Sequence, residues 1–228
     1  GVKCDLCPRK CLVDRKKGEK GICGQTENLK VARAALHFWE EPCISGDAGS
    51  GAVFFSGCPL HCVFCQNENI ANGTVGKEIS LERLVDIFLE LQEKRANNIN
   101  LVTPGHFVPQ IVKALDQARK EGLTLPVVYN TSSYETVDTI KMLEGYVDIY
   151  LPDFKYMSPV LSKKYSHAPD YAEVAKAAIA EMVRQTGKAV FVNGDEDNLI
   201  LSGTIVRHLT LPGCMADSMQ ILKYLHDT

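Results

Sequence analysis

The sequence lacks long apolar runs, and no hydrophobic stretch approaches the roughly 18 residues that a membrane-spanning helix requires. Its first residues lack an apolar stretch of the signal-peptide kind. Its net charge of −3 lacks the positive excess of nucleic-acid-binding or membrane-surface proteins. We therefore expect a cytoplasmic protein that binds neither nucleic acid nor membrane.

Internal repeats and low-complexity segments are also missing. Hydrophobic residues make up 45% of the 228 residues, which is enough for a substantial core and argues against disorder. This length fits one large domain, or one domain with a small appendage.

Cysteine, in contrast, is abundant. There are nine cysteines, an odd number, and seven of them fall in two short segments. Tightly spaced thiols in a reducing compartment favour metal ligation over disulfides. The first segment contains Cys4, Cys7, Cys11 and Cys23, and the second contains Cys58, Cys62 and Cys65.

Short apolar runs alternate with amphipathic segments from residue 52 onward. This pattern predicts a parallel α/β sheet with right-handed crossovers. We expect strands at 52–55, 99–102, 127–129, 147–151 and 204–211, helices at 80–96, 108–121, 135–143, 171–185 and 217–225, and a hairpin over 189–202. Residues 1–45 are expected to form a cysteine-rich metal lobe and a connector, and residues 46–228 the α/β domain.

Polar residues recur where each expected strand ends. Because parallel α/β barrels gather their chemistry at the carboxyl ends of the strands, we expect these residues to share one site. They are the cysteine loop 58–65, the run 103–106, the run 130–132, the run 153–155, and Arg207 with His208.

The second cysteine group has the spacing C-x3-C-x2-C on one loop, directly after a strand-like run. Ferredoxin clusters that are fully ligated by protein use four cysteines, so three thiolates leave one iron of a cubane cluster open. The alternative is a structural zinc site completed by His61, since zinc accepts both thiolate and imidazole ligands.

This spacing, with Phe64 directly before the third cysteine, resembles the radical S-adenosylmethionine (SAM) superfamily. Within it, the chain resembles the pyruvate formate-lyase activating enzymes, especially a related subgroup with extra N-terminal cysteines. The resemblance implies an oxidoreductase with a partial (β/α)6 barrel whose last strand lies beyond residue 228. It also implies that Cys58, Cys62 and Cys65 hold a [4Fe-4S] cluster, on which SAM is cleaved reductively to a 5′-deoxyadenosyl radical that abstracts hydrogen.

The resemblance further implies residues that bind SAM. Phe64 matches the adenine contact, and Asn67 matches an asparagine just past the cluster. Asp153 and Lys155 match an Asp-x-Lys pair that holds SAM; the alternative is a simple surface ion pair.

Three other strand ends are less similar to the family. Thr103 and His106 fall where the family has a Gly-Gly-Glu motif, with His106 in place of the carboxylate. Asn130 occupies the position of an acidic ribose or methionine contact. Arg207 is the candidate catalytic residue, because it can bind a SAM or substrate carboxylate bidentately. His208 is expected to face away from this site.

The four N-terminal cysteines fit either zinc or a second iron–sulfur cluster. Because this segment is too small for its own core, we expect such a metal to fold it. The surrounding cations are expected to be solvated and to offer a docking rim for an acidic electron donor such as flavodoxin or ferredoxin. They are Arg9, Lys10, Arg15, Lys16, Lys17 and Lys20. In the connector, we expect Trp39 to be packed, and Glu40 and Glu41 to be solvated.

Three functions remain open. The first is activation of a glycyl radical enzyme by hydrogen abstraction from a glycine. The second is radical SAM chemistry on another peptide or small molecule. It is favoured because residues 47–51 lack the arginine of the activating enzymes' Asp…Gly-Pro-Gly-x-Arg stretch. The third is a non-catalytic, zinc-stapled binding protein.

Overall fold

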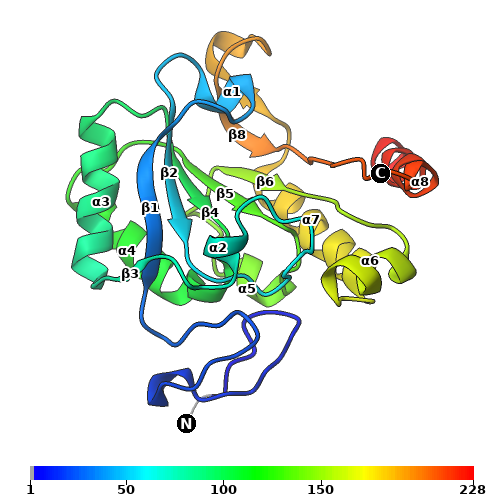
Figure 1. The fold of residues 1–228 in the computed structure, drawn as a ribbon. Helices are drawn as coiled ribbons and strands as arrows, with labels where there is room; N and C mark the ends of the chain where they lie inside the picture. The colour runs from blue at the N-terminus through cyan, green and yellow to red at the C-terminus, as the bar shows by residue number, and fades with distance from the viewer. Residues whose placement is uncertain (1–2) are drawn as a thin grey trace.

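The structure, a computed structural model, describes residues 3–228. Its centre is an open sheet of eight strands in the order β3-β1-β2-β4-β5-β6-β8-β7 (Figure 1). The parallel strands are β2 (Ser50–Phe55), β4 (Ile99–Val102), β5 (Val127–Thr131), β6 (Ile149–Pro152) and β8 (Ile200–Thr204). The antiparallel strands are β1 (Lys30–His37), β3 (Lys77–Glu78) and β7 (Val190–Phe191). The expected parallel α/β fold, a partial barrel that does not close, is confirmed.

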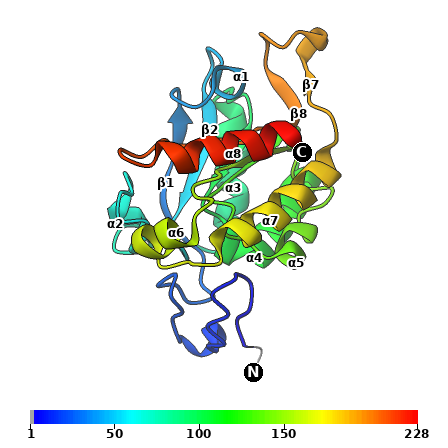
Figure 2. The same cartoon turned by 90° about the vertical axis from the view of Figure 1, so that its right-hand side faces the viewer.

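Helices cover the outer face of this sheet, and an apolar core separates the two layers (Figures 1 and 2). Helix α3 begins where Ser80 Oγ accepts a hydrogen bond from Arg83 N, a standard N-cap. The long helices are α3 (Leu81–Glu93), α4 (Val108–Lys120), α7 (Tyr171–Thr186) and α8 (Met215–Asp227). Short helices are α1 (Pro42–Ser45), α2 (Glu68–Ala71), α5 (Val137–Lys141) and α6 (Pro159–Ser166), with 3₁₀ turns at η1 (Arg15–Lys17), η2 (Gly105–Phe107) and η3 (Val192–Gly194).

The expected strand at 204–211 is wrong in its position. Strand β8 begins at Ile200 and ends at Thr204. The predicted hairpin is present, and its antiparallel pairing with β7 fixes where β8 begins. Beyond Thr204 only an irregular pairing continues, in which Arg207 N donates to Pro152 O at 2.9 Å. Arg207 therefore leaves the regular sheet at the end of β6.

Strand β1 lies within residues 1–45, which we expected to hold only the lobe and its connector. It pairs along its length with β2, so the sheet begins at Lys30. Residues 3–29, called the N-terminal lobe below, lie beyond the end of β2 (Figure 1). Residues 1 and 2 lie outside the described part of the chain.

Helix α8 lies to the side of the sheet, beyond β6 and β8 (Figure 1). Asp217 anchors it, because its carboxylate accepts hydrogen bonds from Met157 N at 3.0 Å and Ser158 N at 2.7 Å. His208 bridges Phe154 O and Ser218 Oγ at 2.7 and 2.8 Å, which also ties α8 to the domain. Among residues 3–228, no helix combines the length and the hydropathy that a membrane span requires.

Candidate functional site

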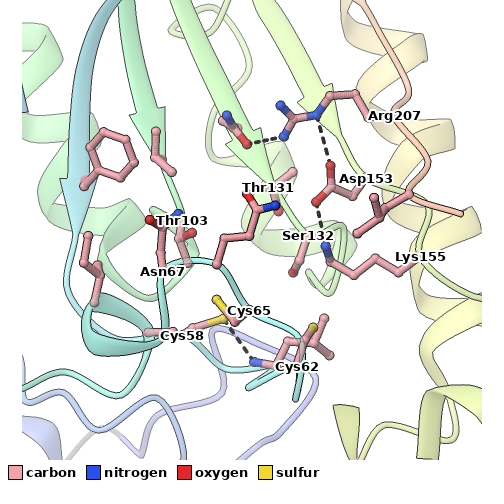
Figure 3. A pocket seen from close by; sticks show the side chains of 18 of the residues that line it. Cys58, Cys62, Cys65, Asn67, Thr103, Thr131, Ser132, Asp153, Lys155 and Arg207 are labelled. Atoms are coloured by element: carbon pink, nitrogen blue, oxygen red, sulfur yellow. Dashed lines mark hydrogen bonds and ion pairs between the residues drawn. The ribbon is translucent and has the colours of Figure 1, made fainter. Parts of the chain in front are cut away.

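A cavity of about 630 Å³ lies on the inner side of the sheet, over the ends of the parallel strands (Figure 3). Its volume is in the range of pockets that bury small molecules and cofactors. Most residues expected from the strand ends do line it. These are Cys58, Cys62, Phe64, Cys65, Asn67, Thr103, Asn130, Asp153, Lys155 and Arg207.

The cysteine loop of residues 58–65, the three-cysteine loop below, follows β2 and forms one wall of this cavity (Figure 3). Two of its sulfur atoms accept hydrogen bonds: Cys58 Sγ from Leu60 N at 3.4 Å, and Cys62 Sγ from Ser166 Oγ at 3.0 Å. Burial raises the pKa of the Cys58 thiol to about 11. A buried thiol of this kind becomes a thiolate when a bound cation supplies compensating charge.

The three-cysteine loop fits an iron–sulfur cluster in its donor chemistry. It presents only soft thiol ligands to the cavity, and hydrogen bonds to such sulfur atoms are a regular feature of iron–sulfur sites. Within residues 3–228, no three Cys, His, Asp or Glu side chains converge as the ligands of a single metal ion would.

His61 does not complete a zinc site on this loop. Its backbone is left-handed, with φ of 53°, and its Nε2 lies 2.7 Å from Ile22 O in the N-terminal lobe. The ring is thus held by the lobe and does not line the cavity.

A chain of charges forms the wall opposite the cysteines (Figure 3). Asp153 lies at its centre, with Oδ2 2.8 Å from Lys155 Nζ and Oδ1 3.0 Å from Arg207 Nε. Burial opposes the charge of Lys155, but Asp153 and then Cys62 outweigh it and raise the lysine pKa. Arg207 Nη2 also donates to Asn130 Oδ1 at 2.7 Å. These side chains line a cavity and bond one another, so this is not an isolated surface ion pair.

The connector contributes residues to the site, which corrects our expectation of a solvated acidic pair. The Glu40 side chain is only 10% exposed, and its Oε2 lies 3.2 Å from Arg207 Nη1. Burial raises the pKa of Glu40 to about 7, Arg207 opposes this shift, and Glu41 adds to it. Trp39 lines the cavity mouth and is 89% exposed, so the expected packing of this residue is wrong.

His106 is not in the cavity. It is 2% exposed, and its Nε2 lies 2.7 Å from Ser56 O. Burial lowers the pKa of His106 to about 4, so it is a neutral residue beneath the site. Of the two residues expected in the Gly-Gly-Glu position, only Thr103, with a φ of 54°, reaches the cavity.

Glu135 is a buried carboxylate that the sequence analysis missed. Its Oε1 accepts hydrogen bonds from Tyr129 OH at 3.0 Å and Thr131 Oγ1 at 2.8 Å, and burial raises its pKa to about 7. It packs against Gly105, where a Cβ atom would lie 2.5 Å from the carboxylate. A single glutamate before a short helix carries no sequence signal that predicts its burial.

The N-terminal cysteines lie outside the cavity, in their own lobe. Cys7 and Cys23 are buried, and Cys11 Sγ accepts a hydrogen bond from Ile22 N at 3.3 Å. This contact places the segment that carries Cys23 beside the loop that carries Cys4, Cys7 and Cys11. Burial raises the pKa of Cys7 to about 12, which a bound metal would offset.

Two of the cations around these cysteines are not solvated, which corrects the expected basic rim. Arg15 is buried and donates from Nη1 to His106 O at 2.6 Å. Arg9 bonds backbone carbonyls of the main domain. The exposed cations of the lobe are Lys3, Lys10, Lys16, Lys17 and Lys20.

Comparison with known proteins identifies sequences that are similar to this chain. The model of the radical SAM superfamily matches residues 52–197, more than half of the chain. The chain is also similar to the uncharacterized protein MJ0674 of Methanocaldococcus jannaschii, with 28% identity over 215 residues. The match covers 92% of this chain but 57% of that protein, so the chain spans little more than half of its length.

Proposed function

The chain belongs to the radical SAM superfamily, and we propose that it holds a [4Fe-4S] cluster through Cys58, Cys62 and Cys65 and cleaves SAM reductively. One observation carries this proposal: the three-cysteine loop and the polar ends of β4, β5 and β6 line one cavity. When bound and reduced, the cluster supplies the electron that breaks the sulfonium bond of SAM, giving methionine and a 5′-deoxyadenosyl radical.

The chain's own residues bind and orient SAM in this proposal. Lys155 is a cation beside the thiol of Cys62 and can hold the carboxylate of SAM. Asp153 lies between Lys155 and Arg207 and keeps both cations in place at the cavity wall. Phe64 offers an aromatic face from the three-cysteine loop for the adenine ring, and Asn67 follows the loop at the start of α2.

We further propose that the four N-terminal cysteines hold zinc or a second iron–sulfur cluster. The contact between Cys11 Sγ and Ile22 N and the burial of Cys7 and Cys23 support a metal there. Exposed lysines of the lobe support docking of an acidic flavodoxin or ferredoxin as electron donor.

For the destination of the radical, the first candidate is a glycine of a partner enzyme. The likeness of the chain to activating enzymes supports it, and so does Trp39, which is exposed at the cavity mouth where a peptide would enter. The second candidate is another peptide or a small molecule, favoured by the missing arginine in residues 47–51.

Anaerobic reconstitution tests the central proposal. We expect dithionite-reduced protein to convert SAM to 5′-deoxyadenosine and methionine, and Cys58→Ser to abolish this conversion. About four irons per chain would assign zinc to the lobe, and about eight a second cluster. Absence of 5′-deoxyadenosine, or cleavage by the Cys58→Ser variant at the wild-type rate, would refute the proposal. A glycyl radical seen by EPR after mixing with a candidate partner would support the first substrate class over the second.

A further inference from the structure

Arg9 is one of the side chains that join the N-terminal lobe to the main domain. It lies between two of the lobe cysteines, in a tight turn closed by Lys10 N donating to Cys7 O at 3.1 Å. The backbone pairing of Cys4 with Val13 closes the loop that carries this turn. The backbone position of Arg9 is therefore fixed by hydrogen bonds that Cys4 and Cys7 make within the lobe.

The guanidinium of Arg9 ends among carbonyl groups of two separate segments. Its Nε donates to Pro59 O at 2.8 Å, inside the three-cysteine loop. Its Nη2 and Nη1 donate to Ser166 O at 2.8 Å and His167 O at 2.6 Å, at the end of α6. Only a planar fork with several fixed N–H groups can join these acceptors at once, and a lysine ammonium cannot.

Both segments joined by Arg9 are connected to the proposed cluster ligand Cys62. Pro59 lies within the C-x3-C spacing that ends at Cys62, and the hydroxyl of Ser166 donates to Cys62 Sγ at 3.0 Å. Arg9 therefore holds both the loop that carries this sulfur and the residue that hydrogen-bonds it.

A second set of contacts joins the same two elements from the other direction. His61, in the middle of the three-cysteine loop, lies 2.7 Å from Ile22 O, directly before a lobe cysteine. Gly57, with φ of 87°, precedes Cys58, and a Cβ atom there would collide with Cys23 O. The lobe thus contacts the loop at its beginning and at its middle.

We propose that Arg9 is a positioning residue for the cluster, and that metal held by the lobe cysteines sets its position. Occupancy of the N-terminal site thereby controls the geometry of the three-cysteine loop. This inference rests on the proposed function, since it requires a cluster at Cys58, Cys62 and Cys65.

The test compares Arg9→Gln and Arg9→Lys with Lys3→Gln, an exposed cation of the same lobe. Each reconstituted protein is measured for iron and zinc content, for the EPR spectrum of the reduced cluster with and without SAM, and for SAM cleavage with dithionite. We expect both Arg9 variants to show a changed SAM-dependent EPR spectrum and at least a tenfold slower cleavage. Lys3→Gln should match the wild type. Because the fork is needed, Arg9→Lys should not restore the spectrum.

Coupling to the lobe metal is tested with Cys11→Ser, alone and combined with Arg9→Gln. If the metal acts through Arg9, Cys11→Ser changes the EPR spectrum in the same way, and the double variant is no worse than the poorer single one. Independent, multiplying losses would overturn the coupling.

Wild-type spectra in both Arg9 variants would overturn the positioning role. If Arg9→Gln does not fold by circular dichroism, Arg9→Lys decides by the same spectrum. Wild-type protein that binds a cluster but does not cleave SAM would refute the proposed function, while the EPR comparison would still judge Arg9. If the wild type cleaves SAM and the Arg9 variants have wild-type EPR spectra, the role of Arg9 is refuted while the proposed function stands.

Discussion

Glu40 is a buried carboxylate whose charge should cost stability above neutral pH. Burial raises its pKa from 4.5 to about 7 in spite of the attraction of Arg207. The folded protein thus binds this proton more tightly than the unfolded chain. The contribution of Glu40 to stability is therefore greatest below pH 4.5 and is lost as the pH rises through about 7. A shift of this size corresponds to about 3 kcal/mol, of which about 2 kcal/mol falls between pH 5.5 and 8.5.

The substitution Glu40→Gln removes this charge and keeps the shape of the side chain. We expect the variant to gain about 2 kcal/mol in unfolding free energy over wild type between pH 5.5 and 8.5. Urea unfolding of the reconstituted protein, followed by far-ultraviolet circular dichroism at several pH values, measures this difference.

Glu41→Gln is the matched control. The Glu41 side chain is 29% exposed and lies 3.7 Å from Arg207, so replacing this less buried charge should change the unfolding free energy less than Glu40→Gln does. A Glu40→Gln effect that is constant with pH, or that decreases as the pH rises, would refute the argument. It would mean that the attraction of Arg207 outweighs burial.

Three further changes probe the site and its supports. Lys155→Met should weaken SAM binding about thirtyfold in an equilibrium titration, because losing the buried cation that pairs with the SAM carboxylate costs about 2 kcal/mol. An unchanged Kd would contradict this role of Lys155. Ser166→Ala removes the hydrogen bond to Cys62 Sγ and should lower the cluster reduction potential in an EPR-monitored titration, whereas a rise would contradict this assignment. Gly57→Ala should reduce iron incorporation far more than Gly18→Ala, because the two φ angles, 87° and 84°, are alike but only the first position is crowded. Equal losses would show that backbone strain alone is responsible.

Much of the fold followed from local pattern. The helix starting at Ser80 and the strand Ile99–Val102 were predicted because their apolar periodicity and cap are short-range features. Strand β1 was missed, since its alanine-rich sequence has little strand signal and it is placed in the sheet by pairing with β2 on one side and β3 on the other. Strand β8 was misplaced for the same reason: the hairpin with β7 decides where it enters the sheet.

The sequence by itself determined the chemistry of the site. Cysteine spacing and the polar residues at strand ends are local properties, and parallel strands bring such ends to one edge. Only the tertiary structure decided which neighbours share that site. Glu40 lines the cavity and His106 does not, contrary to the sequence-based expectations, because segments far apart in the chain pack together. The sequence predicts a solvated Arg9, and only the folded chain places its guanidinium on carbonyl groups about 50 and 157 residues away. Hydrogen bonds over such separations depend on the whole sheet and leave no trace in a local pattern.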